Sequence, residues 1–294
     1  MNFLKTKRCH IISLLLAVVL VTAGCTGLSD LSKGAVSYSH QADELAVHFL
    51  DVGQGDSILI QFPNDSVMLI DAGPDRSGAT VISYLKQQGV KKIDYLVATH
   101  PHADHIGGMA AVIKEFDISK VYMPKVTHTT KTFEDMLLSI KKKGLKITPA
   151  RAGLNIFEQD GCLQATFPAP CSSGYDSLNN YSAVVKIQYG STSFLLTGDA
   201  EDLSEKEMLA SGMNLQADVL KVGHHGSSSS TTPAFLKSVS PEYAVILVGE
   251  ANDYGHPHQE TLDNLADAGV IIYRTDEEGS IKLASDGHSW WREK

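Results

Sequence analysis

Four potential metal ligands stand within six positions of one short segment. His100, His102, Asp104 and His105 form an H-x-H-x-D-H run directly after the apolar segment 93–98. Imidazole and carboxylate groups are the ligands expected of zinc, manganese or iron. The spacing favours two cations, with the first two histidines on one of them and the Asp-His pair on the other. A histidine-rich surface loop is the alternative, but three histidines and an aspartate at this spacing make it the weaker interpretation.

Later segments supply further ligands, each after a strand-like run, where loops commonly carry function. Asp199 follows such a run and is expected to bridge both cations. His225 is assigned to the second cation and its neighbour His224 to the scissile phosphate or the leaving group, although the reverse assignment stays open. His256 is a second candidate for a substrate contact. Taken singly, Asp199 could be a turn aspartate and His256 a surface residue. The candidate catalytic residues are therefore His224, Asp104 and His256.

This ligand set predicts a hydrolase. Two divalent cations would make a water nucleophilic near neutral pH and stabilise the attacking and leaving oxygens of a phosphodiester. Such a hydrolysis needs no covalent enzyme intermediate. Asp56 and Asp71 stand in glycine-containing, turn-like motifs, where a short carboxylate bonds backbone N–H groups. We expect these two residues to fix loops beneath the site rather than to touch the substrate.

An ordered series of motifs runs from about residue 44 to residue 285. It comprises FLDVGQGDS at 49–57, IDAG at 70–73, the H-x-H-x-D-H run, NNYS at 179–182, TGD at 197–199, HHGS at 224–227, YGHPH at 254–258 and YRTD at 273–276. Together these motifs resemble the metallo-β-lactamase fold hydrolases, and in particular the soluble domain of the ComEC competence proteins and their stand-alone relatives. The resemblance implies an α/β fold, an αββα four-layer sandwich, with the ligand motifs on loops along one edge.

One position departs from the wider fold. Most of its members place a third histidine for the first metal before the strand that leads to the bridging aspartate, and Asn180 holds that place here. His128 is the only histidine between His105 and Asp199, and it lies too early. An amide oxygen suits manganese better than it suits zinc. We therefore expect the first site, flanked by Asn180, to be weak, exchangeable or selective for manganese.

Strand-like and helix-like segments alternate in a way that fits a layered α/β architecture. The predicted helices are 78–88, 107–115, 204–211, 233–238 and 259–268. The predicted strands are 45–50, 57–62, 67–71, 93–98, 120–123, 145–149, 163–167, 183–189, 193–198, 217–222, 243–248, 270–273 and 279–283. The domain is expected to span 44–294, because no long linker rich in proline and glycine interrupts it.

The first 25 residues have the features of a bacterial lipoprotein signal. Basic residues precede an apolar run at 11–21, and small residues lead to Cys25. The run is too short for a standard membrane span and has the charged front of an export leader. We expect 1–25 to be the signal, 26–43 a flexible tether, and the mature protein to be lipid-anchored at the outer side of the cell membrane. Ordinary secretion and a retained anchor are the alternatives.

Charge and cysteine content narrow the partners. The chain carries −9, and removal of the leader with its three basic residues leaves −12. This is unfavourable for broad DNA binding, which depends on Lys and Arg. The basic residues at 141–143 and Lys146 are read as a solvated helix face. A disulfide between Cys162 and Cys171 would require the chain to double back, so free thiols are favoured.

Three classes of function stay open on the sequence alone. The first is an extracytoplasmic metal-dependent phosphodiesterase or nuclease, with two zinc or manganese ions, acting on a small phosphodiester or a DNA strand end. The second is a hydrolase of another bond, either a choline phosphoester or a β-lactam. The third is a binding lipoprotein without turnover. The presence of Asp104, Asp199 and the pair His224 and His225 favours an enzyme, and no stable protein partner is inferred.

Overall fold

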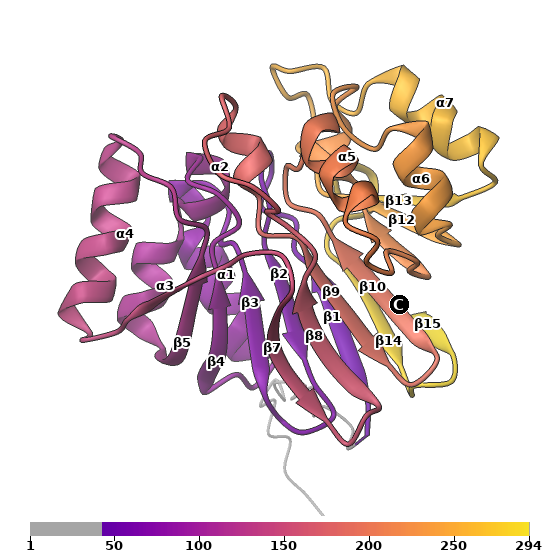
Figure 1. The fold of residues 1–294 in the computed structure, drawn as a ribbon. Helices are drawn as coiled ribbons and strands as arrows, with labels where there is room; N and C mark the ends of the chain where they lie inside the picture. The colour runs from indigo at the N-terminus through magenta and orange to yellow at the C-terminus, as the bar shows by residue number, and fades with distance from the viewer. Residues whose placement is uncertain (1–42, 294) are drawn as a thin grey trace, which may run out of the picture. The chain divides into compact units, whose positions relative to one another are not determined.

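The structure is a computed structural model, and it describes residues 43–293. These residues belong to one compact unit that contains two mixed sheets (Figure 1). The eight-stranded sheet has the order β15 (Trp290–Glu293), β14 (Ile281–Ser285), β1 (Leu45–Phe49), β2 (Ile58–Gln61), β3 (Val67–Ile70), β4 (Lys92–Val97), β5 (Asp117–Met123) and β6 (Ile147–Pro149). The seven-stranded sheet has the order β13 (Ile271–Arg274), β12 (Tyr243–Ile246), β11 (Val219–Lys221), β10 (Thr192–Leu196), β9 (Val185–Tyr189), β8 (Leu163–Phe167) and β7 (Leu154–Gln159).

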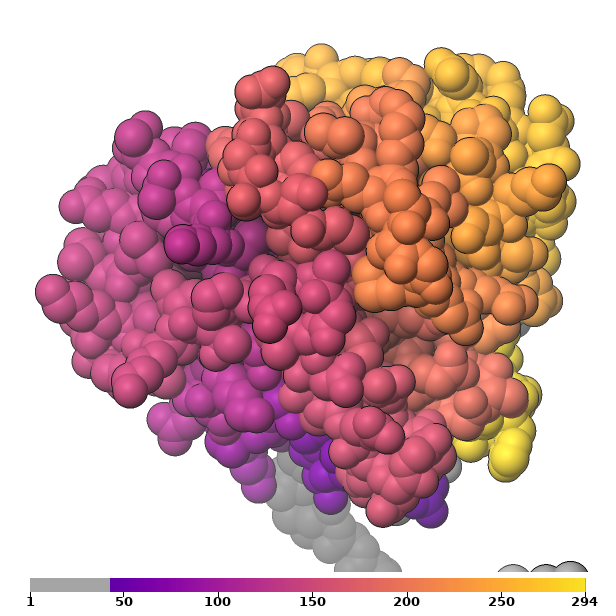
Figure 2. Space-filling model, viewed as in Figure 1, coloured from indigo at the N-terminus to yellow at the C-terminus, as the bar shows by residue number. Residues whose placement is uncertain are grey.

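Helices cover the outer face of each sheet. The first sheet packs on α1 (Gly78–Gln87), α3 (Met109–Glu115) and α4 (Lys131–Lys142), and the second on α5 (Asp202–Ala210), α6 (Pro233–Val239) and α7 (Gln259–Asp267). Short helical segments are η1 (Asp75–Ser77), α2 (Ala103–Ile106), η2 (Leu178–Tyr181), η3 (Gly223–Gly226) and α8 (Thr275–Glu278). Figure 2 shows the magenta first half and the orange-to-yellow second half in direct contact across one face. This arrangement is the expected αββα four-layer sandwich.

A continuous apolar core lies between the two sheets. Phe49, Phe167 and Phe194 are fully buried there and come from β1, β8 and β10. Alternate residues of these strands face the opposite side, so Leu59 of β2 packs under the first helical layer and Leu195 of β10 under the second. Burying each such side chain contributes roughly 1.5–3 kcal/mol, and the three apolar layers together hold the sheets face to face.

Parallel strands meet at the edge where the ligand motifs lie. The pairs β3–β4, β4–β5 and β5–β6 are parallel in the first sheet, and β10–β11, β11–β12 and β12–β13 are parallel in the second. The carboxyl ends of parallel strands lie at one edge of a sheet, and the loops after them form the usual site of α/β folds. Loops carrying Asp71, His100, Asp199 and His225 therefore gather at one edge.

The structure adds elements that the sequence patterns do not predict. These are α8, β7, β15 and the short helical segments. The helix face expected at 141–143 and 146 belongs to α4, which ends at Lys142, so Lys143 and Lys146 lie outside the helix. The start of α4 does carry a helix signal, because the hydroxyl of Thr130 accepts a hydrogen bond from the backbone N–H of Phe133 at 3.4 Å. Lys141 and Lys142 lie on its exposed end, as expected of a solvated helix face. Cys162 and Cys171 are free thiols.

The predicted signal at 1–25, and all but the last residue of the predicted tether at 26–43, lie outside the described residues. Among the described helices, none has both the length and the apolar character needed to cross a membrane.

Candidate metal centre

The loop after β4 places the H-x-H-x-D-H residues against the neighbouring loop of β3. His100 follows the strand directly, His102 stands just before α2, and Asp104 and His105 lie within it. The turn after α2 requires glycine at Gly108, because a Cβ atom there would lie 2.2 Å from the backbone oxygen of Ala72. Close backbone packing thus fixes the direction in which the four side chains project.

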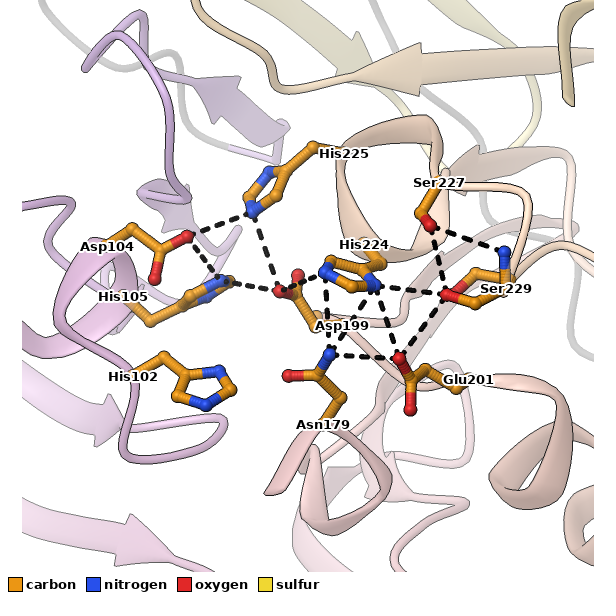
Figure 3. A network of polar contacts seen from close by, with 12 residues as sticks. His102, Asp104, His105, Asn179, Asp199, Glu201, His224, His225, Ser227 and Ser229 are labelled. Atoms are coloured by element: carbon orange, nitrogen blue, oxygen red, sulfur yellow. Dashed lines mark hydrogen bonds and ion pairs between the residues drawn. The ribbon is translucent and has the colours of Figure 1, made fainter. Parts of the chain in front are cut away.

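One carboxylate oxygen lies at the centre of the site. Oδ2 of Asp199 is 3.1 Å from Nε2 of His105 and 3.5 Å from Nε2 of His225. The same oxygen is 3.7 Å from Nε2 of His100 and 3.8 Å from Nε2 of His224. Figure 3 shows three of these histidines converging on Asp199 from two sides. Four imidazoles from both sheets therefore surround one carboxylate, as expected of a residue that would bridge two cations.

A second cation group is formed by Asp104, His105, Asp199 and His225. These four residues offer ligand atoms within 4.8 Å of one another. Nε2 of His225 also lies 3.3 Å from Oδ2 of Asp104. The group matches the predicted ligands of the second cation, and we name it the second group.

The predicted ligands of the first cation also lie together. Nε2 of His100 is 2.9 Å from Nδ1 of His102, and the His100 ring is fully buried whereas the His102 ring is partly exposed. We name His100, His102 and Asp199 the first group. His128, which lies too early in the sequence to be the third histidine, is half-buried, and its ring centre is 6.2 Å from that of His102.

The backbone at η3 separates the roles of the two adjacent histidines. His224 and His225 both have positive φ angles, 47° and 52°, which non-glycine residues rarely adopt. Gly226 follows with φ 85°, and a Cβ atom there would be 2.5 Å from Cβ of Pro257. With this tight turn, His225 points into the second group, whereas His224 points to Glu201 and Ser229.

Asn180 differs from its predicted place beside the first cation. Its Oδ1 accepts a hydrogen bond from the backbone N–H of Ser204 at 3.1 Å, so this amide caps the N-terminus of α5. The neighbouring Asn179 faces the site instead. Its Nδ2 donates to Oε1 of Glu201 at 3.1 Å and lies 3.4 Å from the ring nitrogens of His224. The site-facing amide is therefore Asn179, one position earlier than expected.

A cavity of about 330 Å³ opens onto both groups. Its walls are formed by Gln54, His102, Ala103, Asp104, Asp199, His224, His225, Tyr254 and His256. Burial and the nearby His224 and His225 lower the pKa of His256 to about 4, so this ring is neutral at pH 7. The two histidine candidates for substrate contact thus line the cavity, and Asp104 reaches it as well.

Residues behind the ligands hold them in place. Oδ2 of Asp71 is 2.8 Å from Nδ1 of His105, and its other oxygen accepts from the backbone N–H of Thr99. Oδ1 of Asp56 is 3.3 Å from Nδ1 of His225, and Oδ2 pairs with the buried Lys221. Both aspartates lie beneath the site, as the sequence motifs suggested.

Two residues of this layer were missed by the sequence analysis. Lys221 is a single lysine within an apolar strand, and that contrast was the available signal. Glu201 follows the central aspartate by two positions, and a hydrogen bond from His224 lowers the pKa of its carboxyl to about 2. Neither residue stands in a recognisable ligand spacing.

The carboxylates of the second group stabilise positive charge next to them, either on the histidine rings or on a bound cation. Burial alone would lower the pKa of His105 and of His225, yet Asp199 and Asp104 outweigh it and hold both pKa values well above the ordinary 6.5. Burial would raise the pKa of Asp199, but His105 and His225 hold it well below 3.8. The carboxylates therefore stay charged and attract cations.

The residues of the second group fit a divalent metal ion. Nε2 of His105, Nε2 of His225 and Oδ1 of Asp199 are buried and make no hydrogen bond, although such atoms in a folded protein normally do. They point at the shared space of the second group. Buried ligand atoms of this type, beside charged carboxylates, form a divalent metal site.

Comparison with known proteins agrees with this geometry. The family model described as the metallo-beta-lactamase superfamily matches residues 50–250. The chain is 32% identical to ComE operon protein 3 of Bacillus subtilis over 286 residues, covering 91% of this chain and 36% of that protein. It is 31% identical to the competence protein ComA of Neisseria gonorrhoeae over 258 residues, covering 86% of this chain and 34% of that protein.

The chain thus spans about a third of the length of these relatives. Among solved structures, the metallo-beta-lactamase fold protein YhfI from Bacillus subtilis is similar, with a TM-score of 0.54 at 13% identity, covering 82% of this chain and 100% of that one. At that identity the likeness shows the fold alone. The matched family model, the two-sheet sandwich and the ligand cluster at its edge together show that this chain belongs to the metallo-β-lactamase superfamily.

Proposed function

We propose that this protein is a metal-dependent phosphodiesterase that acts on small phosphodiesters or on the end of a nucleic acid strand. The observation that carries the proposal is the position of Asp199, at the centre of four imidazoles and in the wall of a cavity. His100, His102 and Asp199 would hold one cation, and Asp104, His105, Asp199 and His225 the other. The cations, zinc or manganese, would supply Lewis acidity and lower the pKa of a bound water.

His224 is the residue best placed to assist the leaving group. Its Nδ1 lies 3.2 Å from Oγ of Ser229 and 3.5 Å from Oε1 of Glu201. These contacts orient the ring so that Nε2 faces the cavity, 3.8 Å from Oδ2 of Asp199. A histidine held in this way can give a proton to a departing oxygen. His256, neutral at pH 7, is proposed to contact the substrate by hydrogen bonding.

Size and charge support a small substrate. The cavity of about 330 Å³ is at the lower end of the range for ligand pockets. The strongly negative chain is unfavourable for duplex DNA lying over its surface, because such binding depends on many Lys and Arg contacts. Two cations supply positive charge only locally, enough for a single phosphodiester.

The alternatives find less support. A choline phosphoester site would need aromatic side chains around the cation, and among the described residues Tyr254 is the single Phe, Tyr or Trp in the wall of the cavity. An efficient zinc β-lactamase would need strong nitrogen ligands on the first cation, and among the described residues the first group offers two imidazoles, those of His100 and His102. A binding protein without turnover would have no reason to keep His224 held between Glu201 and Ser229.

A panel of substrates tests the proposal. The protein is assayed with bis-p-nitrophenyl phosphate, p-nitrophenyl phosphorylcholine, nitrocefin and single-stranded DNA, each with zinc and with manganese. Hydrolysis of the first and the last with either metal is the expected result. Faster turnover of the choline ester or of nitrocefin would replace the proposed function, and no turnover of any substrate by a protein with two bound cations would favour a binding role.

Attachment to the outer side of the cell membrane is also proposed, from the signal-like segment that ends at Cys25. Replacing this cysteine, Cys25→Ser, should move the protein from the membrane fraction to the medium or leave an unprocessed precursor. Normal processing with membrane retention would refute the lipid anchor and leave the proposed chemistry untouched.

A further inference from the structure

A lysine lies buried directly behind the second group. Lys221 is the last residue of β11, and 0% of its surface is exposed. Its Nζ is 2.6 Å from Oδ2 of Asp56 and donates a hydrogen bond to the backbone oxygen of Gly198 at 3.2 Å. Burying two charges is costly, and an apolar pair of similar volume is often as stable. The position of this pair therefore calls for a reason other than stability.

The pair connects the two sheets at the candidate site. Asp56 belongs to the loop between β1 and β2, on the first sheet, whereas the lysine belongs to the second. The backbone N–H of Asp56 donates to the oxygen of Asp104 at 3.2 Å, and its side chain lies 3.3 Å from Nδ1 of His225. Gly198, which the lysine binds, directly precedes Asp199. The two residues of this ion pair thus contact Asp104, His225 and the residue before Asp199.

The second group depends on such a connection, whereas the pair of histidines in the first group does not. Asp104 and His105 come from the first sheet, and Asp199 and His225 come from the second. Their ligand atoms meet only if the ends of the two sheets keep one relative position. His100 and His102, by contrast, come from a single short loop.

The lysine also supplies a positive charge where buried carboxylates gather. Asp56, Asp71 and His105 offer ligand atoms within 4.8 Å of one another and are all buried. Nζ of Lys221 lies 2.6 Å from Oδ2 of Asp56, the carboxylate next to His225. The ammonium group against Asp56 thus balances a carboxylate without a further metal ion.

We propose that the ion pair between Lys221 and Asp56 positions the ligands of the second cation by holding the ends of the two sheets together. Lys221 is a positioning residue, since it contacts neither the substrate cavity nor a ligand side chain directly. The inference rests on the proposed metal-dependent function for its relevance, but its test measures metal binding and not hydrolysis.

The test compares Lys221→Met, Asp56→Leu and the double variant with the unchanged full chain. Calorimetric titration with manganese gives the number and affinity of bound cations, and thermal unfolding gives stability. Each single variant should lower the melting temperature and weaken the second cation by about 10- to 100-fold, the usual cost of losing a residue that supports a ligand. The double variant should regain the melting temperature, because no charge stays unpaired, but not the affinity.

Lys186→Met is the matched control. Lys186 lies in β9 of the same sheet, is 8% exposed, and donates to the backbone oxygen of Asn214 at 2.8 Å, away from the ligands. Its replacement should lower stability without changing the number or affinity of bound cations.

Two results would overturn the inference. In the first, metal affinity changes together with the melting temperature: both fall in the single variants and both return in the double variant. That result is expected if the ion pair has only a structural role. The other is unchanged cation affinity of the second group in both single variants, which would show that the ion pair does not position its ligands. Two bound cations without hydrolysis would refute the proposed function and leave the positioning role to be judged by affinity alone.

Discussion

The two cation groups are built from similar ligands but are supported differently. In the second group, Nδ1 of His105 is 2.8 Å from a carboxylate oxygen of Asp71, and Nδ1 of His225 is 2.9 Å from the backbone oxygen of Leu247. In the first group, the hydrogen-bond partners of Nδ1 of His100 within residues 43–293 are hydroxyl groups, at 3.1 Å on Thr99 and 3.4 Å on Ser182.

This difference sets an expected order of affinity. A carboxylate or carbonyl behind a histidine accepts the ring N–H, fixes the tautomer and makes the other nitrogen a better ligand. A hydroxyl can donate or accept, so it fixes the tautomer less firmly. His102 also keeps a partly exposed ring. We therefore expect the second group to bind its cation tightly and the first group to exchange its cation.

The largest effect should come from the residue that the two groups share. Asp199→Ala should abolish activity and lower the bound metal below two ions per chain, because one carboxylate serves both groups. Metal analysis of the purified variant by mass spectrometry measures this. Full metal content would show that the carboxylate does not bridge.

The pH dependence of metal binding should distinguish the groups next. His105 and His225 must lose their protons to bind a cation, and their raised pKa values mean that they keep protons above pH 6.5. Affinity of the second group should rise with pH above 6.5, by up to about 100-fold per unit if both protons are released. Burial and His105 hold the pKa of His100 well below 6.5, so the first group should change little.

The stability of the metal-free protein should change with pH in the opposite direction to the metal affinity. A raised pKa in the folded protein stabilises it fully below the unfolded value, near 6.5, and this contribution is lost as pH rises through the raised pKa. The metal-free protein should therefore melt at lower temperature as pH increases above 6.5, and thermal unfolding at a series of pH values measures this.

The proton release predicted for metal binding is measured by calorimetric titration with the metal in buffers of different ionisation enthalpy. Zero proton release would contradict that prediction.

The support of His105 can be removed without removing a ligand. In Asp71→Asn the amide oxygen can still accept from Thr99, but the carboxylate opposite Nδ1 of His105 is lost. Affinity of the second group should fall by about 10- to 100-fold while the first group keeps its affinity within a small factor. An equal loss of metal affinity at both groups would mean that the hydrogen-bond partners behind the histidines do not determine which group binds its cation more tightly.

The smallest effect concerns Asn179, the amide that contacts Glu201 and His224. Asn179→His should tighten zinc at the first group and reduce any need for manganese, because borderline ions favour nitrogen ligands. Asn180→His is the matched control. It should leave metal preference unchanged and cost about 0.5–2 kcal/mol of stability, since it removes the hydrogen bond to Ser204 at the start of α5. If Asn180→His changed the metal preference and Asn179→His did not, the amide next to the first cation would be that of Asn180.

Much of the fold could be predicted from local patterns. Apolar runs placed most strands within one or two residues, and β1 and β3 are examples. The first ligand segment stood out because four side chains that commonly bind metal ions fall within the six positions 100–105. The prediction gave α4 only as a basic helix face and without its start, despite the hydroxyl of Thr130 there, and it omitted β15, which pairs with β14. The signal at 1–25 lies outside the described residues and stays a prediction.

By itself, the sequence determined which residues could bind metal, since ligand type and short-range spacing are local properties. Tertiary structure decided what each of them faces. The positive φ angles at His224 and His225 send one ring to the second group and the other to Glu201. The pairing of Lys221 with Asp56 joins residues far apart in the chain. Such contacts depend on how two sheets pack, and neither spacing nor composition encodes that packing locally.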